Sequence, residues 1–196
     1  MKSEAYKGTF GGVGAMQPLQ LEAAKLIVVW GNNVTFSNLH LAPIIKRAKA
    51  KGAKLVVIDP KRIKIAEQAD MYIAVRPGMD IILAFAIAAE LERIGGFDHD
   101  FIAQHVQGAD EFMAEARKLT IEESSRLCGV PVDDIRKFAA LYKDSSPAAI
   151  SVGNGIERNR NGGNSIRAIF ALPALAGKFG LRGGGIVGGS GNLFPK

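Results

Sequence analysis

Four short polar stretches carry the residues of this sequence that are best suited to bind a ligand. They are Gly31-Asn32-Asn33, Asp59-Pro60-Lys61-Arg62, Arg76-Pro77-Gly78-Met79-Asp80 and the loop from Gly153 to Gly162, which includes Asn154, Gly155, Arg158 and Asn161. Each stretch follows an apolar run and places a glycine or proline beside a polar side chain. A glycine allows the main chain to approach a ligand closely, and the polar side chain beside it can form hydrogen bonds with that ligand. We therefore treat the four stretches as candidate parts of one binding site.

Each stretch also has a purely structural explanation. Asn and Gly tolerate left-handed backbone, so Gly31-Asn32-Asn33 is also explained as a turn. Asp59 is also explained as a strand end, although an acid ending a second strand is where Rossmann domains bind a ribose hydroxyl. Asp80 is also explained as a helix N-cap, a role that is compatible with ligand contact. For the loop from 153 to 162 we favour a ligand-binding role over a purely structural one, because a structural loop seldom needs two arginines.

Several common chemistries are excluded by residues that the sequence lacks. Cys128 is the only cysteine, so one chain cannot form a disulfide, an iron–sulfur cluster or a cysteine zinc site. The three histidines are scattered, and we expect no metal held by protein side chains. No GxGxxG after the first apolar run, Walker A loop, Gly-x-Ser-x-Gly elbow or metalloprotease helix is present, so we assign no catalytic residue. We expect Cys128 to be a core residue rather than a nucleophile.

Composition narrows the class of partner. The net charge of +6 fits either ordinary solubility or an anionic ligand. Aromatic residues are few and are not interleaved with Lys/Arg runs, so we expect no nucleic-acid partner. The longest apolar candidate, residues 81–96, is interrupted by Glu90, Glu92 and Arg93, so we expect no membrane span.

Apolar runs without alternation predict strands buried on both faces. The predicted strands are residues 25–30, 53–59, 71–75 and 148–153. Helices are predicted at 40–52, within 60–70, at 81–96 and at 164–180, the last interrupted at Pro173. Residues 98–143 show helical patterns only, with a capping box from Thr120 to Glu123 and an amphipathic helix over 130–145.

This alternation predicts the α/β class, as a three-layer Rossmann-like parallel sheet with helices on both faces and a helical insertion. We divide the chain into a lead-in segment at 1–24 with one short helix, a Rossmann-like dinucleotide-binding domain at 25–180 and a Gly-rich loop tail at 181–196. The helical insertion occupies 98–143. Ligands of such sheets lie outside the carboxyl ends of the strands, where the four polar stretches begin.

Taken together, the four stretches resemble motifs of the molybdopterin oxidoreductases, the superfamily of dimethyl sulfoxide reductase and formate dehydrogenase. The family's Trp-Gly-x-Asn-Pro matches residues 30–33 with Val34 in place of proline, and its Ile-Asp-Pro-Arg matches 58–62 with one extra lysine. Its Arg-Pro-Gly-Thr-Asp matches 76–80 with Met79 for threonine, and its Gly-x-Gly-x-x-Arg-His-x-Asn-Gly matches 153–162 with Asn159 for histidine. The resemblance covers residues 6 to 192.

The resemblance implies that this region binds one molybdopterin guanine dinucleotide. The pyrophosphate suits backbone N–H groups at residues 31–33, and Lys61 and Arg62 would offset its charge. Asp80 would accept hydrogen bonds from guanine, with Asp59 near the ribose or guanine. The implied cofactor-binding residues are Gly31, Asn32, Asn33, Asp59, Pro60, Lys61, Arg62, Gly78, Asp80, Gly153, Asn154, Gly155, Arg158 and Asn161, the last two toward the pterin.

The family's iron–sulfur cysteines and its Ser, Cys or selenocysteine metal ligand precede the matching region, and the second dinucleotide is held mostly by a later domain. We therefore expect a segment of a molybdenum or tungsten enzyme, inactive alone, that partners the remaining domains and an electron-transfer subunit. Its location would be cytoplasmic or periplasmic, with the cytoplasm preferred. The alternatives are a stand-alone binding module for another nucleotide and an interaction domain that has lost its ligand.

Overall fold

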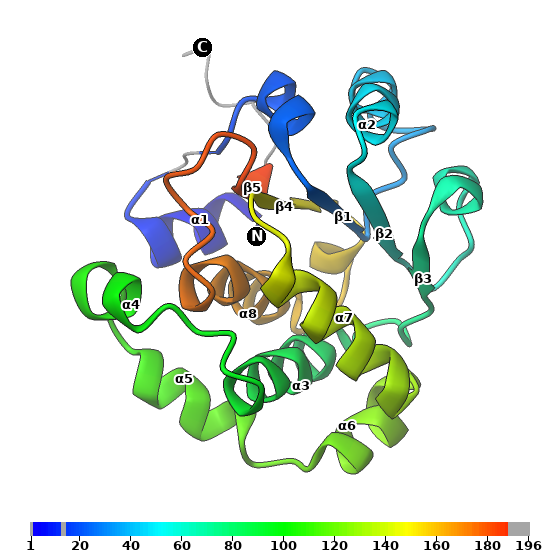
Figure 1. The fold of residues 1–196 in the computed structure, drawn as a ribbon. Coiled ribbons are helices and arrows are strands. Elements are labelled where there is room, and N and C mark those ends of the chain that lie inside the picture. The colour runs from blue at the N-terminus through cyan, green and yellow to red at the C-terminus, as the bar shows by residue number, and fades with distance from the viewer. Residues whose placement is uncertain (1, 13–14, 188–196) are drawn as a thin grey trace.

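A computed structural model describes residues 2–12 and 15–187 and shows a parallel five-stranded sheet between helical layers (Figure 1). The strands are β1 (Leu26–Trp30), β2 (Lys54–Ile58), β3 (Met71–Ile73), β4 (Ala148–Val152) and β5 (Gly185–Val187). Their order across the sheet is β3-β2-β1-β4-β5, and every neighbouring pair is parallel. The predicted α/β class and parallel sheet are confirmed.

The strands lack alternation because both faces of the sheet are covered. Leu26, Val28 and Trp30 of β1 belong to the larger core cluster, whereas Ile27 and Val29 belong to the cluster on the opposite face. Side chains alternate between faces along a strand, so a strand covered on both sides must be apolar at every position. All residues of β1 and β4 are buried accordingly.

Helices cover the two faces unequally. The larger core lies under α1 (Lys2–Phe10), α3 (Asp80–Arg93), α4 (His99–His105), α5 (Ala109–Ala116), α6 (Ile121–Cys128), α7 (Val132–Asp144) and α8 (Gly162–Leu175). The smaller core lies under α2 (Leu41–Ala50) and the short 3₁₀ helices η1 (Pro18–Ala23) and η2 (Lys64–Gln68). A third 3₁₀ turn, η3 (Ile156–Arg158), follows β4. The predicted arrangement of helices on both faces is confirmed.

The helical block is also as predicted. The predicted capping box begins α6: the Glu123 N–H donates to Thr120 Oγ1 at 3.2 Å, and the Thr120 N–H donates to the Glu123 carboxylate at 2.8 Å. Residues 98–143 contain α4 to α6 and most of α7, without a strand. The side chains of Ile135 and Phe138 in α7 are fully buried, as is Cys128, which is a core residue.

Two local predictions differ from the structure. β5 lies in the tail that we expected to be loop; a three-residue strand between glycines has no clear pattern and forms through pairing with β4. The part of that tail at 188–196 lies outside the described residues. Helix α8 continues through Pro173 to Leu175, because a proline in the last turn removes only one helical hydrogen bond. The short helix expected in the lead-in is present as α1, and its Tyr6 ring lies 4.5 Å from that of Phe170 in α8. The division into lead-in, domain and tail stays a prediction.

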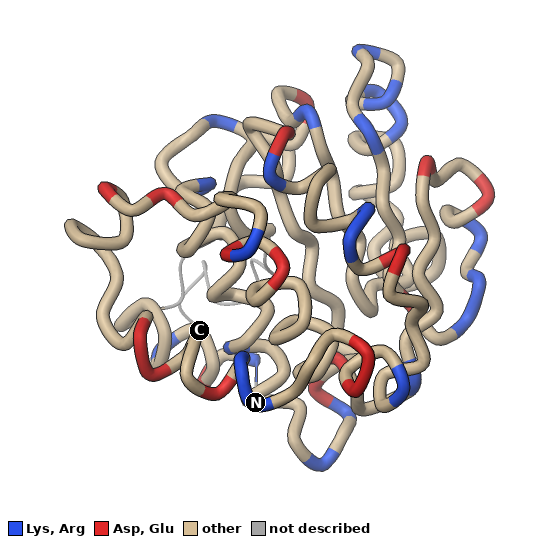
Figure 2. The backbone as a smooth tube through the Cα atoms, turned by 60° about the horizontal axis from the view of Figure 1, so that its bottom comes forward, with Lys and Arg blue, Asp and Glu red and all other residues tan. Residues whose placement is uncertain are grey.

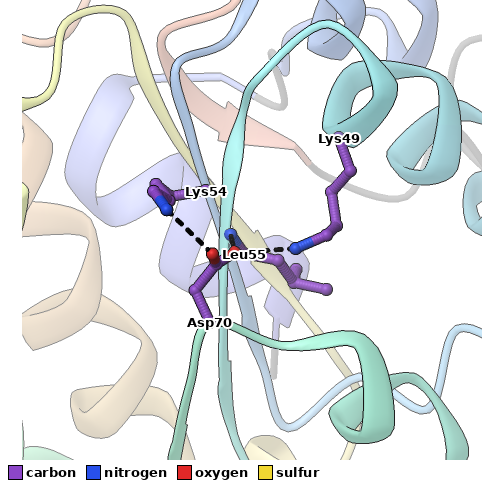
Figure 3. A network of polar contacts seen from close by, with 4 residues as sticks. All are labelled: Lys49, Lys54, Leu55 and Asp70. Atoms are coloured by element: carbon purple, nitrogen blue, oxygen red, sulfur yellow. Dashed lines mark hydrogen bonds and ion pairs between the residues drawn. The ribbon is translucent and has the colours of Figure 1, made fainter.

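A polar network ties β2 to β3 at the amino edge of the sheet (Figure 3). Asp70 accepts hydrogen bonds from the Leu55 N–H at 2.8 Å, from Lys49 Nζ at 2.7 Å and from Lys54 Nζ at 3.1 Å. Burial raises the pKa of Asp70, but the three donors outweigh it and lower the pKa to about 2. The folded state therefore favours the ionised carboxylate.

Replacing Asp70 with Asn should lower the free energy of unfolding at pH 7 by about 1 kcal/mol, once solvent screening is allowed for. The folded pKa is depressed below the usual value of 3.8, so this stability is present above pH 4 and is lost as the pH falls toward 2. Urea denaturation of wild type and Asp70→Asn across this range measures it. Glu67→Gln, at an exposed neighbour, is the control; a difference between wild type and Asp70→Asn that did not change with pH would contradict the assignment.

Candidate functional site

The carboxyl ends of β1, β2 and β4 open onto one cavity of about 540 Å³. Its lining residues are Lys2, Pro18, Gly31, Asn32, Asn33, Ser37, Asn38, Leu41, Asp59, Lys61, Ile63, Ser151, Val152, Gly153, Asn154, Gly155 and Val187. Three of the four polar stretches thus share one cavity, as expected for the carboxyl edge of a parallel sheet. Another cavity of similar volume, near Phe10 and Phe179, has a mainly apolar lining and contains none of the predicted site residues.

The loops after β1 and β4 lie in direct backbone contact. Gly31 has a φ of +57°, donates its N–H to Ile58 O at 2.9 Å and accepts from the Gly155 N–H at 3.3 Å. A Cβ at Gly153 would overlap Gly31 O, and one at Gly155 would lie 3.0 Å from the same oxygen. These glycines are therefore required by the close approach of two loops that together form one wall of the cavity.

Backbone donors are available at this wall. No hydrogen bond within the described residues uses the N–H of Asn32, Asn33 or Asn154, all of which line the cavity. The carbonyls on this loop are occupied, because Val34 N–H donates to Asn32 O at 2.8 Å and Phe36 N–H donates to Asn33 O at 3.0 Å. Amides without a protein acceptor suit phosphate oxygens, so this donor set fits the pyrophosphate of a dinucleotide.

Two side-chain contacts brace the inner part of the cavity. Asn32 is 8% exposed and its Nδ2 donates to Ser151 Oγ at 2.9 Å, which joins the ends of β1 and β4. Lys2 Nζ donates to Val152 O at 2.6 Å, and the Lys2 N–H donates to Glu157 at 2.8 Å. Burial lowers the pKa of Lys2, opposed by the charge of Glu157.

Sequence reasoning missed Lys2 and Ser151 as cavity residues. Lys2 lies in a segment without periodicity, and only the packing of α1 brings it to the end of β4. Ser151 lies inside an apolar run, so its position in the sequence predicts only an ordinary strand residue. The pairing of β1 with β4 was needed to place it beside Asn32.

The stretch after β2 divides between the cavity and the surface. Asp59 and Lys61 line the cavity, and Asp59 Oδ1 accepts from the Lys61 N–H at 2.9 Å. Burial raises the pKa of Asp59, while the hydrogen bond and charge of Lys61 oppose this. Pro60 and Arg62 are not in the cavity lining; the Arg62 guanidinium lies 5.4 Å from the centre of the Tyr72 ring.

Asp80 is not among the residues that line the cavity. The residue is 5% exposed, and Oδ1 of its carboxylate accepts from Trp30 Nε1 at 2.8 Å. Burial raises the pKa of Asp80; the Trp30 hydrogen bond opposes this, and the nearby charge of Asp59 adds to it. The N-cap explanation is wrong, because Met79 occupies the N-cap and Asp80 is the first helical residue of α3.

The remaining predicted residues belong to the loops beyond β3 and β4. Gly78, with a φ of +81°, would place a Cβ 3.5 Å from Asn159 Oδ1, so these two loops meet. Arg158 ends η3, and Asn161 precedes α8 and accepts from Asn164 Nδ2 at 2.9 Å. Gly78, Arg158 and Asn161 lie outside the cavity lining. The structure therefore places them near the cavity loops but not in the cavity itself.

Charge is distributed rather than concentrated on one face. Figure 2 shows Lys and Arg on many elements, interspersed with Asp and Glu. Within the cavity lining, Lys2 and Lys61 stand against one acid, Asp59. In residues 2–12 and 15–187, no three His, Cys, Asp or Glu side chains are grouped to hold a metal, and no helix there is long and apolar enough to cross a membrane.

In open parallel sheets of this kind, ligands bind outside the carboxyl ends of the strands, and the donor-lined cavity lies at this edge. The molybdopterin oxidoreductase family model matches residues 2–191, and the chain belongs to this family. The family implies a molybdopterin cofactor that carries molybdenum or tungsten.

Relatives are similar over nearly the whole chain. Probable oxidoreductase YyaE of Bacillus subtilis is 38% identical over 182 residues, covering 93% of this chain and 27% of that protein. Formate dehydrogenase H of Escherichia coli is 31% identical over 177 residues, 89% of this chain and 25% of that protein. Acetylene hydratase from Pelobacter acetylenicus superposes with a TM-score of 0.82 at 25% identity, covering 91% of this chain and 24% of that one. The chain thus spans about a quarter of the length of these relatives.

Replacing Gly153 with Ala should destabilise the fold by about 3 kcal/mol, because the new methyl group meets a backbone oxygen that cannot move independently. Gly163→Ala is the matched control, since a Cβ there meets nothing within 4 Å, and it should change stability by less than about 1 kcal/mol. Chemical denaturation of the two variants measures the difference. Equal stability of both would show that the β1 and β4 loops are not in close contact.

Proposed function

We propose that this chain holds one molybdopterin guanine dinucleotide along the carboxyl edge of its sheet, as part of a molybdenum- or tungsten-dependent oxidoreductase. The observation that carries the proposal is the cavity itself. It joins the loops after β1, β2 and β4, and it combines one carboxylate and two lysines with backbone N–H groups that have no acceptor among the described residues. Family membership supplies the cofactor class.

The phosphate part of the ligand would lie against the wall made by the loops after β1 and β4. Asn32, Asn33 and Asn154 contribute backbone N–H groups that have no acceptor within the described residues. Lys61 adds positive charge from the end of β2. Several N–H donors converging on one anion bind it without a dedicated arginine clamp.

The acidic side chains that follow β2 and β3 would recognise guanine by accepting hydrogen bonds from it. Guanine presents N1–H and an amino group on one edge, and an ionised carboxylate accepts from both donors. Asp59 lies in the cavity, and Asp80 lies close enough for the charge of Asp59 to raise its pKa. We assign the base-reading role to Asp80 and a ribose or guanine contact to Asp59, with Gly78 giving the β3 loop its close turn.

The pterin end would extend toward the loop after β4. Gly153 and Gly155 keep this loop against Gly31, while Arg158 and Asn161 continue it toward α8. When bound, the cofactor supplies the metal whose oxidation state changes by two electrons. The residues of this chain bind and orient that cofactor. The remaining domains, an iron–sulfur cluster and an electron-transfer subunit would belong to the complete enzyme.

The chain should bind GDP more tightly than ADP, and Asp80→Asn should remove most of that preference, by roughly tenfold or more. Adenine lacks the adjacent pair of donors from which a carboxylate accepts hydrogen bonds in guanine. The ratio of the two dissociation constants therefore measures recognition of the base. Isothermal titration calorimetry of the chain with both nucleotides measures the ratio. Asp133→Asn is the matched control, because this exposed acid occupies the first turn of α7 as Asp80 does in α3. An equal affinity for GDP and ADP in the wild type would reject guanine recognition and favour the alternative of a binding module for another nucleotide.

Removing the charge of Lys61 should weaken GDP and ADP binding alike, by about fivefold at low ionic strength, since the ammonium acts on phosphate rather than on the base. Lys61→Gln is compared with Lys64→Gln, which removes an exposed lysine that does not line the cavity. The same titrations are repeated at two salt concentrations. A loss in Lys64→Gln as large as that in Lys61→Gln would indicate non-specific attraction by net charge.

A further inference from the structure

We propose that Trp30 is a positioning residue for base recognition, whose indole N–H fixes the orientation of the Asp80 carboxylate that reads guanine. This inference rests on the proposed function and names a residue that would never touch the ligand. It starts from one buried hydrogen bond, between Trp30 Nε1 and Asp80 Oδ1 at 2.8 Å.

The donor of this bond is held rigidly. Trp30 is the last residue of β1, it is fully buried, and it pairs in register with Ile58 of β2 and Val152 of β4. A side chain packed at interior density sits in a rotamer minimum, and its interdigitated neighbours hold it there on the time average. The indole N–H therefore points at a fixed place, the first turn of α3.

The acceptor keeps capacity for a ligand. Oδ1 of Asp80 accepts from Trp30 Nε1, and the carboxylate also accepts from the backbone N–H of Asp80 itself. No other described residue donates to it, so lone pairs of both oxygens stay available to a ligand. A carboxylate anchored at one oxygen cannot rotate freely, so the directions of its remaining lone pairs are set before the ligand arrives. Because the carboxylate is already oriented, less conformational entropy is lost when it accepts hydrogen bonds from both guanine donors.

The same bond favours the charged form of Asp80, which base reading requires. Burial and the charge of Asp59, at the end of β2, both raise the pKa of Asp80. The Trp30 hydrogen bond opposes them, as does the N-terminus of α3, where an anion is favoured. A protonated Asp80 would present a donor to guanine N1–H or N2, and the pairing would be lost.

Trp30 is the only tryptophan in the chain, which allows a nearly isosteric test. Expression of the 196-residue chain with benzothienylalanine in place of tryptophan replaces the indole N–H by sulfur at this position alone. The preference for GDP over ADP should fall about tenfold at the lower of two pH values and less at the higher, because burial raises the pKa of Asp80 and loss of the indole donor raises it further. A role in packing alone would weaken GDP and ADP equally; a folded analogue with the wild-type ratio at both pH values would overturn the inference.

A second measurement needs no altered protein. In the wild-type chain, the single indole N–H resonance should shift with the same midpoint as the carboxyl carbon of Asp80 during an NMR pH titration. An indole resonance that ignores the titration of Asp80 would overturn the inference, even if the analogue-substituted chain failed to fold.

Different results would reject the proposed function and the role of Trp30. A wild-type chain without preference for GDP rejects the proposed function and this inference with it. A preference that Asp80→Asn abolishes but the N–H-free analogue retains leaves the proposed function standing and rejects the role of Trp30.

Discussion

The backbone contact between the loops after β1 and β4 is the constraint on which the rest of the site depends. Gly31 takes a left-handed conformation and passes directly against Gly153 and Gly155, with no space for a side chain at Gly153. Because the two strands are central neighbours in a parallel sheet, their loops leave the same edge together. The contact turns the amides of Asn32 and Asn154 into parts of one cavity wall.

Two groups of polar contacts surround this wall. The cavity lining has backbone donors and Lys61, which suit phosphate. The buried pair of Trp30 and Asp80, outside the lining, joins the end of β1 to the start of α3. The two groups are connected, because the charge of Asp59 in the lining raises the pKa of Asp80 and Trp30 O accepts from the Gly153 N–H. Phosphate attraction and base recognition are assigned to different side chains of this connected set.

The sequence predicted the architecture well because buried parallel strands have a distinctive composition. Continuous apolar runs identify β1 and β4 without tertiary information, whereas β5 is too short for a pattern and depends on pairing with β4. Polar residues at strand ends located the cavity loops. The direction of a side chain depends on packing, however, so neither the burial of Asp80 against Trp30 nor the arrival of Lys2 from α1 followed from spacing.

The central claim is that the diphosphate of a guanine nucleotide lies against the joined loops that follow β1 and β4. The most direct measurement is an amide ¹H–¹⁵N NMR titration of the chain with GDP, which reports every backbone N–H separately. The account predicts that the largest shifts occur at Asn32, Asn33 and Asn154. Shifts that instead gather around Phe179 and Leu181, at the apolar cavity, would contradict it.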